Sequence, residues 1–220
     1  MSRAAAFTRQ NIHPATRRGL GLILYELIKN THDWGRTGVD NVPLRPSVRG
    51  ILFTRLNVNL EGAIASAGGN PALESYVTSL GQRSRDNYVR FLELSVFDSG
   101  PGLASRWLSK PLTDDVTAEE ELAACFSCLS KHKTSSRASN RGLGLYDVMH
   151  TLDELHGFMR LRTGRLALFR DFVSSPLQAD EQMNGPTLFD WHSASTVPTR
   201  IPQTTGTLFT MVIPLVEENA

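Results

Sequence analysis

The sequence lacks the features that mark membrane, secreted and nucleic-acid-binding proteins. Its 23 Lys and Arg residues nearly balance 22 Asp and Glu residues, so charge predicts neither a nucleic-acid partner nor a membrane surface. No stretch approaches the ~18 apolar residues that a membrane span needs. No apolar signal-peptide segment follows the basic N-terminus. We therefore expect a cytoplasmic protein with no membrane partner.

Cysteine is also scarce. The chain has two, Cys125 and Cys128, in a CxxC pattern with His132 four residues further on. A zinc site needs about four ligands, and no second Cys or His pair has useful spacing. A redox CxxC would open a helix after a strand, whereas this one lies inside an expected helix over 116–130. Two ordinary thiols on a helix are the simplest interpretation.

The chain fits a single domain over residues 1–220, with 40% hydrophobic residues and no internal repeat. Apolar residues at Leu20, Leu24, Leu27 and Ile28 have helical spacing. The pattern predicts helices over 16–34, 71–82, 116–130 and 142–157, and strands over 49–60, 88–97, 158–163, 165–172 and 206–215. This order predicts an α+β fold, a two-layer sandwich with a mixed, mostly antiparallel sheet. The Pro-, Ser- and Thr-rich segment 173–203 is the best candidate for a mobile or partner-facing loop.

Three polar residues share one face of the first expected helix. Glu26, Asn30 and Asp33 are spaced i, i+4 and i+7. A solvated polar face is the simpler interpretation. The alternative is a metal and water site, because Asn offers a neutral oxygen to a hard cation and Glu can take a proton from water.

The expected strand over 88–97 is followed by Asp98, Gly100 and Gly102. A carboxylate at a strand end can accept a hydrogen bond from an exocyclic amine, and glycines let a flat ring lie against the backbone. An ordinary turn uses the same residues.

Two further glycine segments precede regular elements. Gly142 and Gly144 open a helix after a basic loop, and helix N-termini bind phosphate. That loop supplies cations and donors at Lys131, Lys133, Thr134, Ser135, Arg137 and Arg141. Gly206 and Thr207 open the final strand, where a plain turn is the simpler interpretation.

The segments "ELIKNTHDW", "DSGPGL", "NRGLGLYDV" and "GTLFTMVIPL" together resemble the N, G1, G2 and G3 boxes of the GHKL ATPase superfamily. That superfamily includes gyrase-type topoisomerases, a class of chaperones, histidine kinases and mismatch-repair proteins. The resemblance extends from about residue 17 to 216 and is weakest at two apparent insertions, about 40–88 and 173–203. It implies the Bergerat ATP-binding fold, with ATP and Mg²⁺ as cofactors.

The resemblance also implies roles for individual residues. Asn30 would hold Mg²⁺, Glu26 would activate the attacking water, and Asp33 would be the acid of the N box. Asp98 would accept from the adenine amine, assisted by Thr207. The base would lie against Gly100, Gly102 and Leu103, and a lid over about 129–141 would include Lys131, Lys133, Thr134, Ser135 and Arg141. Backbone N–H groups of Gly142, Leu143, Gly144 and Leu145 would contact the phosphates.

The branch of the superfamily is less defined. The final strand is similar to that of histidine kinases, but only about sixteen residues precede the first helix, too few for a dimerising domain with a phosphoacceptor His. The E-x-x-x-N-x-x-D pattern is similar to that of hydrolysing members. We expect an ATP-hydrolysing switch in which closure of the lid controls the interaction with a partner protein or a second domain. A homodimer is compatible with this expectation. A serine or histidine protein kinase and a binding module without turnover are the alternatives.

Overall fold

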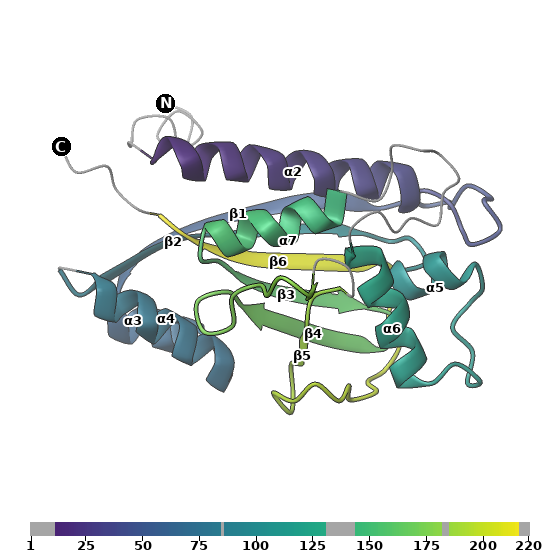
Figure 1. The fold of residues 1–220 in the computed structure, drawn as a ribbon. Helices are drawn as coiled ribbons and strands as arrows, with labels where there is room; N and C mark the ends of the chain where they lie inside the picture. Colours follow the sequence, from purple (N-terminus) through teal and green to yellow (C-terminus); the bar gives the residue numbers. More distant parts are fainter. Residues whose placement is uncertain (1–11, 85, 131–143, 182–184, 216–220) are drawn as a thin grey trace.

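The computed structural model describes residues 12–84, 86–130, 144–181 and 185–215 (Figure 1). Six strands form one sheet in the order β1-β2-β6-β3-β4-β5, and every pair of neighbours is antiparallel. The strands are β1 (Arg49–Asn59), β2 (Tyr88–Asp98), β3 (Phe158–Thr163), β4 (Leu166–Asp171), β5 (Phe189–Asp190) and β6 (Thr207–Pro214). The helices are α2 (Pro14–Trp34), α3 (Leu60–Ser66), α4 (Pro71–Arg83), α5 (Leu103–Leu108), α6 (Ala118–Leu129) and α7 (Gly144–Glu154). The α+β class is confirmed.

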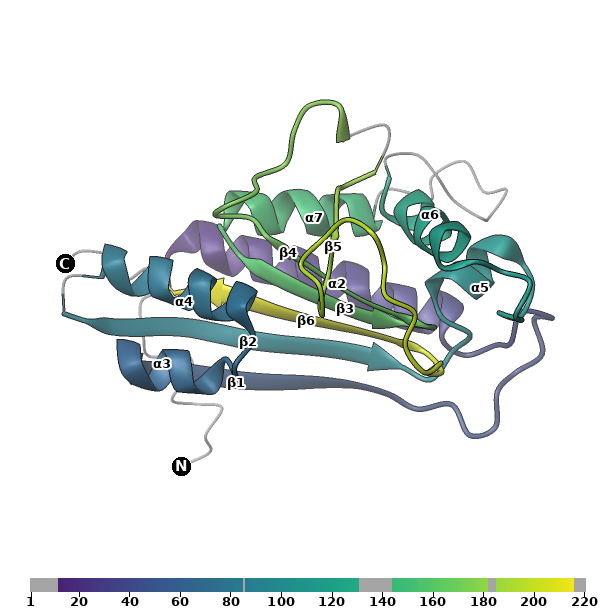
Figure 2. The same ribbon diagram turned by 90° about the horizontal axis from the view of Figure 1, so that it is seen from below.

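Helices lie on both faces of the sheet (Figures 1 and 2). The pair α2 and α7 covers one face, while α3 and α4 cover one end of the other. The expectation of a two-layer sandwich with a mixed sheet is therefore corrected in two respects. The described strands pair only in antiparallel fashion, and α3 and α4 add a partial third layer. The reason is that alternate β2 residues, such as Val89 and Phe91, are also apolar and need cover.

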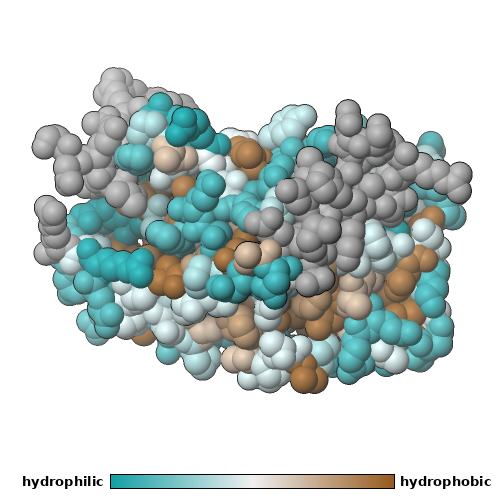
Figure 3. Space-filling model, viewed as in Figure 1, coloured by the Kyte–Doolittle hydropathy of each residue, from teal (hydrophilic) through white to brown (hydrophobic). Residues whose placement is uncertain are grey.

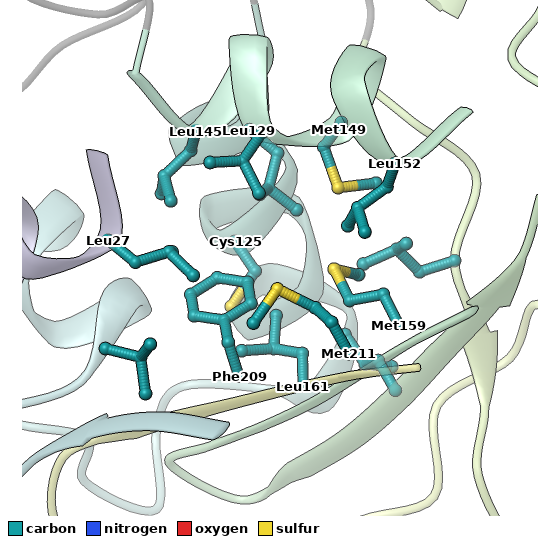
Figure 4. Close-up of a cluster of buried hydrophobic side chains, with 14 of the residues drawn as sticks. Leu27, Cys125, Leu129, Leu145, Met149, Leu152, Met159, Leu161, Phe209 and Met211 are labelled. Atoms are coloured by element: carbon teal, nitrogen blue, oxygen red, sulfur yellow. The ribbon is translucent and has the colours of Figure 1, made fainter. Parts of the chain in front are cut away.

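The main core lies between the sheet and the α2–α7 layer (Figure 4). Leu92, Leu94 and Val96 alternate along β2 and point toward it, as alternation along a strand requires. Figure 4 shows Phe209 and Met211 of β6 packed beneath helical residues that include Leu27, Leu145 and Met149. Burial of this continuous apolar surface is the main stabilising contribution to the fold.

Helix α2 presents a slightly different face from the expected one. Ile23 and Leu27 are fully buried, whereas Ile28 is 42% exposed. Burial at Leu20, Ile23, Leu27 and Thr31 follows the i, i+3, i+4 spacing, which places Ile28 at the edge of the stripe. Helix α7 packs antiparallel to α2, because Gly19 lies against Thr151 and Leu155 while Glu26 lies against Gly144.

Helix α6 begins with a capping box. Thr117 accepts from the backbone N–H of Glu120, and the Glu120 carboxylate accepts from the backbone N–H of Thr117. One turn further on, the fully buried Glu121 pairs with Arg165, the second residue of the β3–β4 turn. This ion pair fixes α6 to the end of the sheet at which β2 ends.

Two predicted segments gain definition from the structure. The apparent insertion over 40–88 contains β1, α3 and α4, which contribute to the sheet and its cover, and α3 was not expected. The described part of 173–203 is anchored rather than loosely attached. Its Glu181 carboxylate pairs with the buried Arg170 at 2.6 Å, and Asp190 accepts backbone N–H groups from His192, Ser193 and Thr199.

Candidate functional site

The polar face of α2 lies at the end of the molecule where β2 ends. Glu26, Asn30 and Asp33 are all half-buried, in contrast to a freely solvated face. Glu26 lies against the start of α7, so closely that a side chain on Gly144 would collide with its carboxylate. Glycine at 144 therefore lets the two helices approach and places a carboxylate beside a helix N-terminus.

Helix α7 begins at Gly144, and the N–H groups in the first turn of an α-helix have no intrahelical acceptor. Gly144 and Leu145 both lie in this turn. The Leu145 side chain packs into the main core, so its backbone is held in place. The geometry thus provides oriented donors beside Glu26, the arrangement that favours an anionic group.

Asn30 carries an unsatisfied polar atom. Its Nδ2 is buried and has no hydrogen-bond partner among the described residues. A half-turn of the amide would place the oxygen there instead. A buried amide atom without a partner is costly, and an amide oxygen in that position can ligate a hard cation. In the described ranges, His, Cys, Asp and Glu form no group of three or more that could bind a metal by themselves.

Asp98 is held from several sides. Its Oδ1 accepts from the Gly100 N–H at 2.7 Å, and it lies in register with Arg49 on β1 and Thr207 on β6. Burial raises the pKa of Asp98, and the Gly100 and Thr207 N–H groups oppose this increase. The carboxylate is therefore a partly desolvated acceptor at the tip of a central strand.

The glycines around Asp98 accommodate the protein's own backbone. A Cβ on Gly35 would lie 2.7 Å from the Asp98 Cβ, and one on Gly100 would lie 2.8 Å from the Gly35 Cα. Gly100 and Gly102 were expected to make room for a base, and the packing of the fold by itself also requires glycine at both positions. Gly102 has φ +85°, and a side chain there would meet Thr163 Oγ1 at 2.9 Å.

Thr163 is a residue that the sequence alone did not identify. Its buried hydroxyl accepts from the Leu103 N–H at 3.1 Å and donates to the Gly206 carbonyl at 3.3 Å. The Gly206 N–H in turn donates to the Gly100 carbonyl at 2.6 Å. These bonds join the turns that follow β2, follow β3 and precede β6, and so position Asp98, Leu103 and Thr207 as one unit.

Arg106 on α5 was also not anticipated. Its Nη2 donates to the Trp34 carbonyl at 3.0 Å and the Thr37 carbonyl at 2.7 Å, which joins α5 to the end of α2. Its positive charge also favours the ionised form of Asp98, although burial lowers the pKa of Arg106. No short motif marks such a residue, because its partners are more than 60 residues away in sequence.

Several predicted contact residues fall outside the described ranges. These are Lys131, Lys133, Thr134, Ser135, Arg137, Arg141, Gly142 and Leu143. The predicted lid over about 129–141 therefore has only its first two residues in the described part of the chain, Leu129 at the end of α6 and the buried Ser130.

The two cysteines are free thiols on α6. Cys125 is buried and Cys128 half-buried. Burial raises the pKa of Cys128 to about 12 and raises that of Cys125 well above the ordinary value. Thiolates are the reactive and metal-binding form, so this environment disfavours both kinds of chemistry.

The surface over α2 and α7 mixes hydrophobic and hydrophilic residues rather than forming one continuous apolar area (Figure 3). Across the part of the chain that is described, no helix has both the length and the apolar character needed to cross a bilayer.

A scan against protein-family models gave no match to this chain, and a search of curated proteins gave none either.

Proposed function

We propose that the chain is an ATP-binding domain of the GHKL type with the Bergerat fold. ATP would bind with Mg²⁺ at the end of the sheet where β2 ends, and slow hydrolysis would make the domain a switch for a protein partner. One observation carries the proposal. Motifs far apart in sequence meet there, since Glu26 contacts Gly144 while Gly35, just after α2, contacts Asp98.

Each residue has a role that its surroundings support. Asp98, partly desolvated, accepts from the adenine amine, and Thr207 beside it assists. Asn30 has the unsatisfied amide that suits it to hold Mg²⁺, which when bound neutralises phosphate charge. The α7 N-terminus donates N–H groups to the phosphates. Glu26, beside that terminus, orients or deprotonates the attacking water.

The proposal is tested by calorimetric titration of the whole chain with ATP, with and without Mg²⁺. Wild type should bind ATP. Asp98→Asn should lose most of the affinity, because an amide NH₂ group can then face the adenine amine, and both groups are hydrogen-bond donors. Asp153→Asn is the matched control, because the Asp153 carboxylate likewise accepts a hydrogen bond from a backbone N–H, that of Leu177 at 2.9 Å. It lies at the far end of α7 and should bind ATP normally. Absence of ATP binding in wild type would refute the proposal.

Hydrolysis is tested separately with Glu26→Gln. Phosphate release should disappear in this variant while ATP binding persists, because Gln keeps the size of Glu but cannot accept a proton. Retained phosphate release would refute the role of Glu26. Transfer of labelled phosphate to a protein, rather than its release, would identify the kinase alternative.

A further inference from the structure

A large cavity lies on the sheet face opposite to α2 and α7. Its volume is about 830 Å³, within the range of small-molecule sites. Strand alternation forms its floor from one row of paired residues across four strands: Leu52, Ser95, Thr210 and Arg160. Figure 2 shows this face, with α3 and α4 over one end and the segment after β5 crossing it. The cavity reaches Asp98 and Thr207 at one end, but its floor faces away from Glu26 and Asn30.

One wall of the cavity is rigid and aromatic. Trp191 packs edge-on against Phe158 and Phe169, with ring centroids 6.3 and 5.9 Å apart. Its backbone N–H donates to the Ala167 carbonyl at 2.9 Å, and its carbonyl accepts from Asn70 at 3.2 Å. The indole is thus fixed between β4 and the start of α4.

Arg160 lies over this indole, with its Cζ 4.7 Å from the ring centroid. A cation–π contact holds the guanidinium in place without using its N–H donors. Arg160 pairs with its neighbouring strands through its backbone, but its side chain has no ion-pair or hydrogen-bond partner among the described residues. The neighbouring Arg162, by contrast, donates to the carbonyls of Gly164 and Pro202 at 2.7 and 2.5 Å. Arg160 is therefore the available cation of the floor.

The opposite charge stands on the other side of the cavity. Glu93, half-buried on β2, likewise has no ion-pair partner in the described part of the chain. Strand β6 separates β2 from β3, so the strands carrying Glu93 and Arg160 lie roughly 10 Å apart. Between the two charges, the Ser95 and Thr210 hydroxyls pair at 3.0 Å. One hydroxyl proton of that pair is left free to donate to a ligand.

We propose that this cavity binds a small zwitterionic amino-carboxylate, with its carboxylate on Arg160 and its ammonium group on Glu93. A simple anion would leave Glu93 unpaired, and a simple cation would leave Arg160 unpaired, each at an electrostatic cost. The separation of the two strands selects a molecule whose charges lie at opposite ends of a chain. Arg160 and Glu93 have no role in the ATP proposal, although the cavity also reaches Asp98 and Thr207.

The test is an NMR titration of the whole chain with three probes, followed at the Trp191 indole N–H. The probes are ε-aminohexanoate, its isomer norleucine, which has adjacent charges, and hexanoate, which has no amine. Only ε-aminohexanoate should reach both charged groups. It should bind about tenfold more tightly than either of the others, the change expected for one charge-assisted hydrogen bond.

Variants then assign the contacts. Arg160→Gln should weaken both ε-aminohexanoate and hexanoate, whereas Glu93→Gln should remove only the advantage of ε-aminohexanoate over hexanoate. Arg55→Gln is the matched control, since Arg55 is exposed on β1 and, in register with Leu92, lies on the opposite face. Circular dichroism confirms that each variant is folded. The proposal is overturned if no saturable shift occurs at Trp191, or if the two cavity variants bind like wild type.

Discussion

Replacing Arg165 by Met should destabilise the fold strongly, because it leaves a buried carboxylate without its counter-charge. Glu121 is 0% exposed and Arg165 is 3% exposed, with Nε 2.8 Å from Glu121 Oε2. Arg165 also donates to the carbonyls of Thr113 and Val116 at 3.2 and 2.9 Å. Met keeps much of the apolar volume of Arg but none of these donors.

The expected loss is about 3–5 kcal/mol, the usual effect of removing one partner from a buried ion pair. For a chain of this length, each kcal/mol lowers the melting temperature by roughly 2–4 °C, so the midpoint should fall by about 10 °C. The measurement is urea unfolding followed by circular dichroism, with a thermal scan as a second readout.

Arg200→Met supplies the matched control. Arg200 pairs with Asp114 at 2.5 Å, but the two side chains are 47% and 97% exposed. An exposed pair contributes less than about 1 kcal/mol, so this variant should be nearly as stable as wild type. Adding Glu121→Gln to Arg165→Met should recover part of the loss by removing the unpaired charge. Equal losses in Arg165→Met and Arg200→Met, or no recovery in the double variant, would contradict the reasoning.

Three further predictions follow from single residues. Gly206→Ala should destabilise the fold by more than the ~1–2 kcal/mol that a left-handed backbone costs an alanine, because φ is +78° and the new Cβ would also collide with the Asp98 carbonyl. Gly68→Ala, at φ +63° with open space around it, should show the backbone strain alone. Urea unfolding measures both losses. Asp98→Asn should raise the free energy of unfolding near neutral pH. The pKa of Asp98 is raised in the folded state, so wild type loses stability as the pH rises through that pKa, whereas Asn stays neutral. Below pH 3.8 the two proteins should be equally stable, and a difference that is constant at all pH values would contradict this reasoning. Burial raises the pKa of Glu181, but hydrogen bonds, chiefly from Arg170, outweigh burial and lower the pKa to about 2. Wild type should therefore lose stability as the pH falls from 4.5 to 2, and Glu181→Gln should lack this part of the acid transition.

The sequence predicted the long regular elements because their signals are local. The helix expected over 116–130 and the strands expected over 158–163 and 165–172 are set by neighbouring residues, and the structure confirms them as α6, β3 and β4. The short helices α3 and α5 were missed because seven and six residues are too few to show a helical period.

The surroundings of the candidate site were less accessible to sequence reasoning. Glu26 and Asp98 were selected from motifs, but Thr163 and Arg106 came only from the structure, because they act through partners distant in sequence. The glycine pattern also has a reason that lies within the fold itself. Gly100 and Gly102 make room for Gly35 and Thr163, and that requirement exists whether or not a base binds nearby.

The last strand in the described part of the chain, β6, lies in the middle of the sheet. Strand β6 pairs with β2 on one side and with β3 on the other. Until residues 207–214 have been synthesised, these edges of β2 and β3 have no strand to pair with. The sheet must therefore close after the rest of the domain has left the ribosome. Fragments that end before Thr207 should keep both edges open and aggregate, and folding should be slow because its decisive pairings join distant parts of the chain.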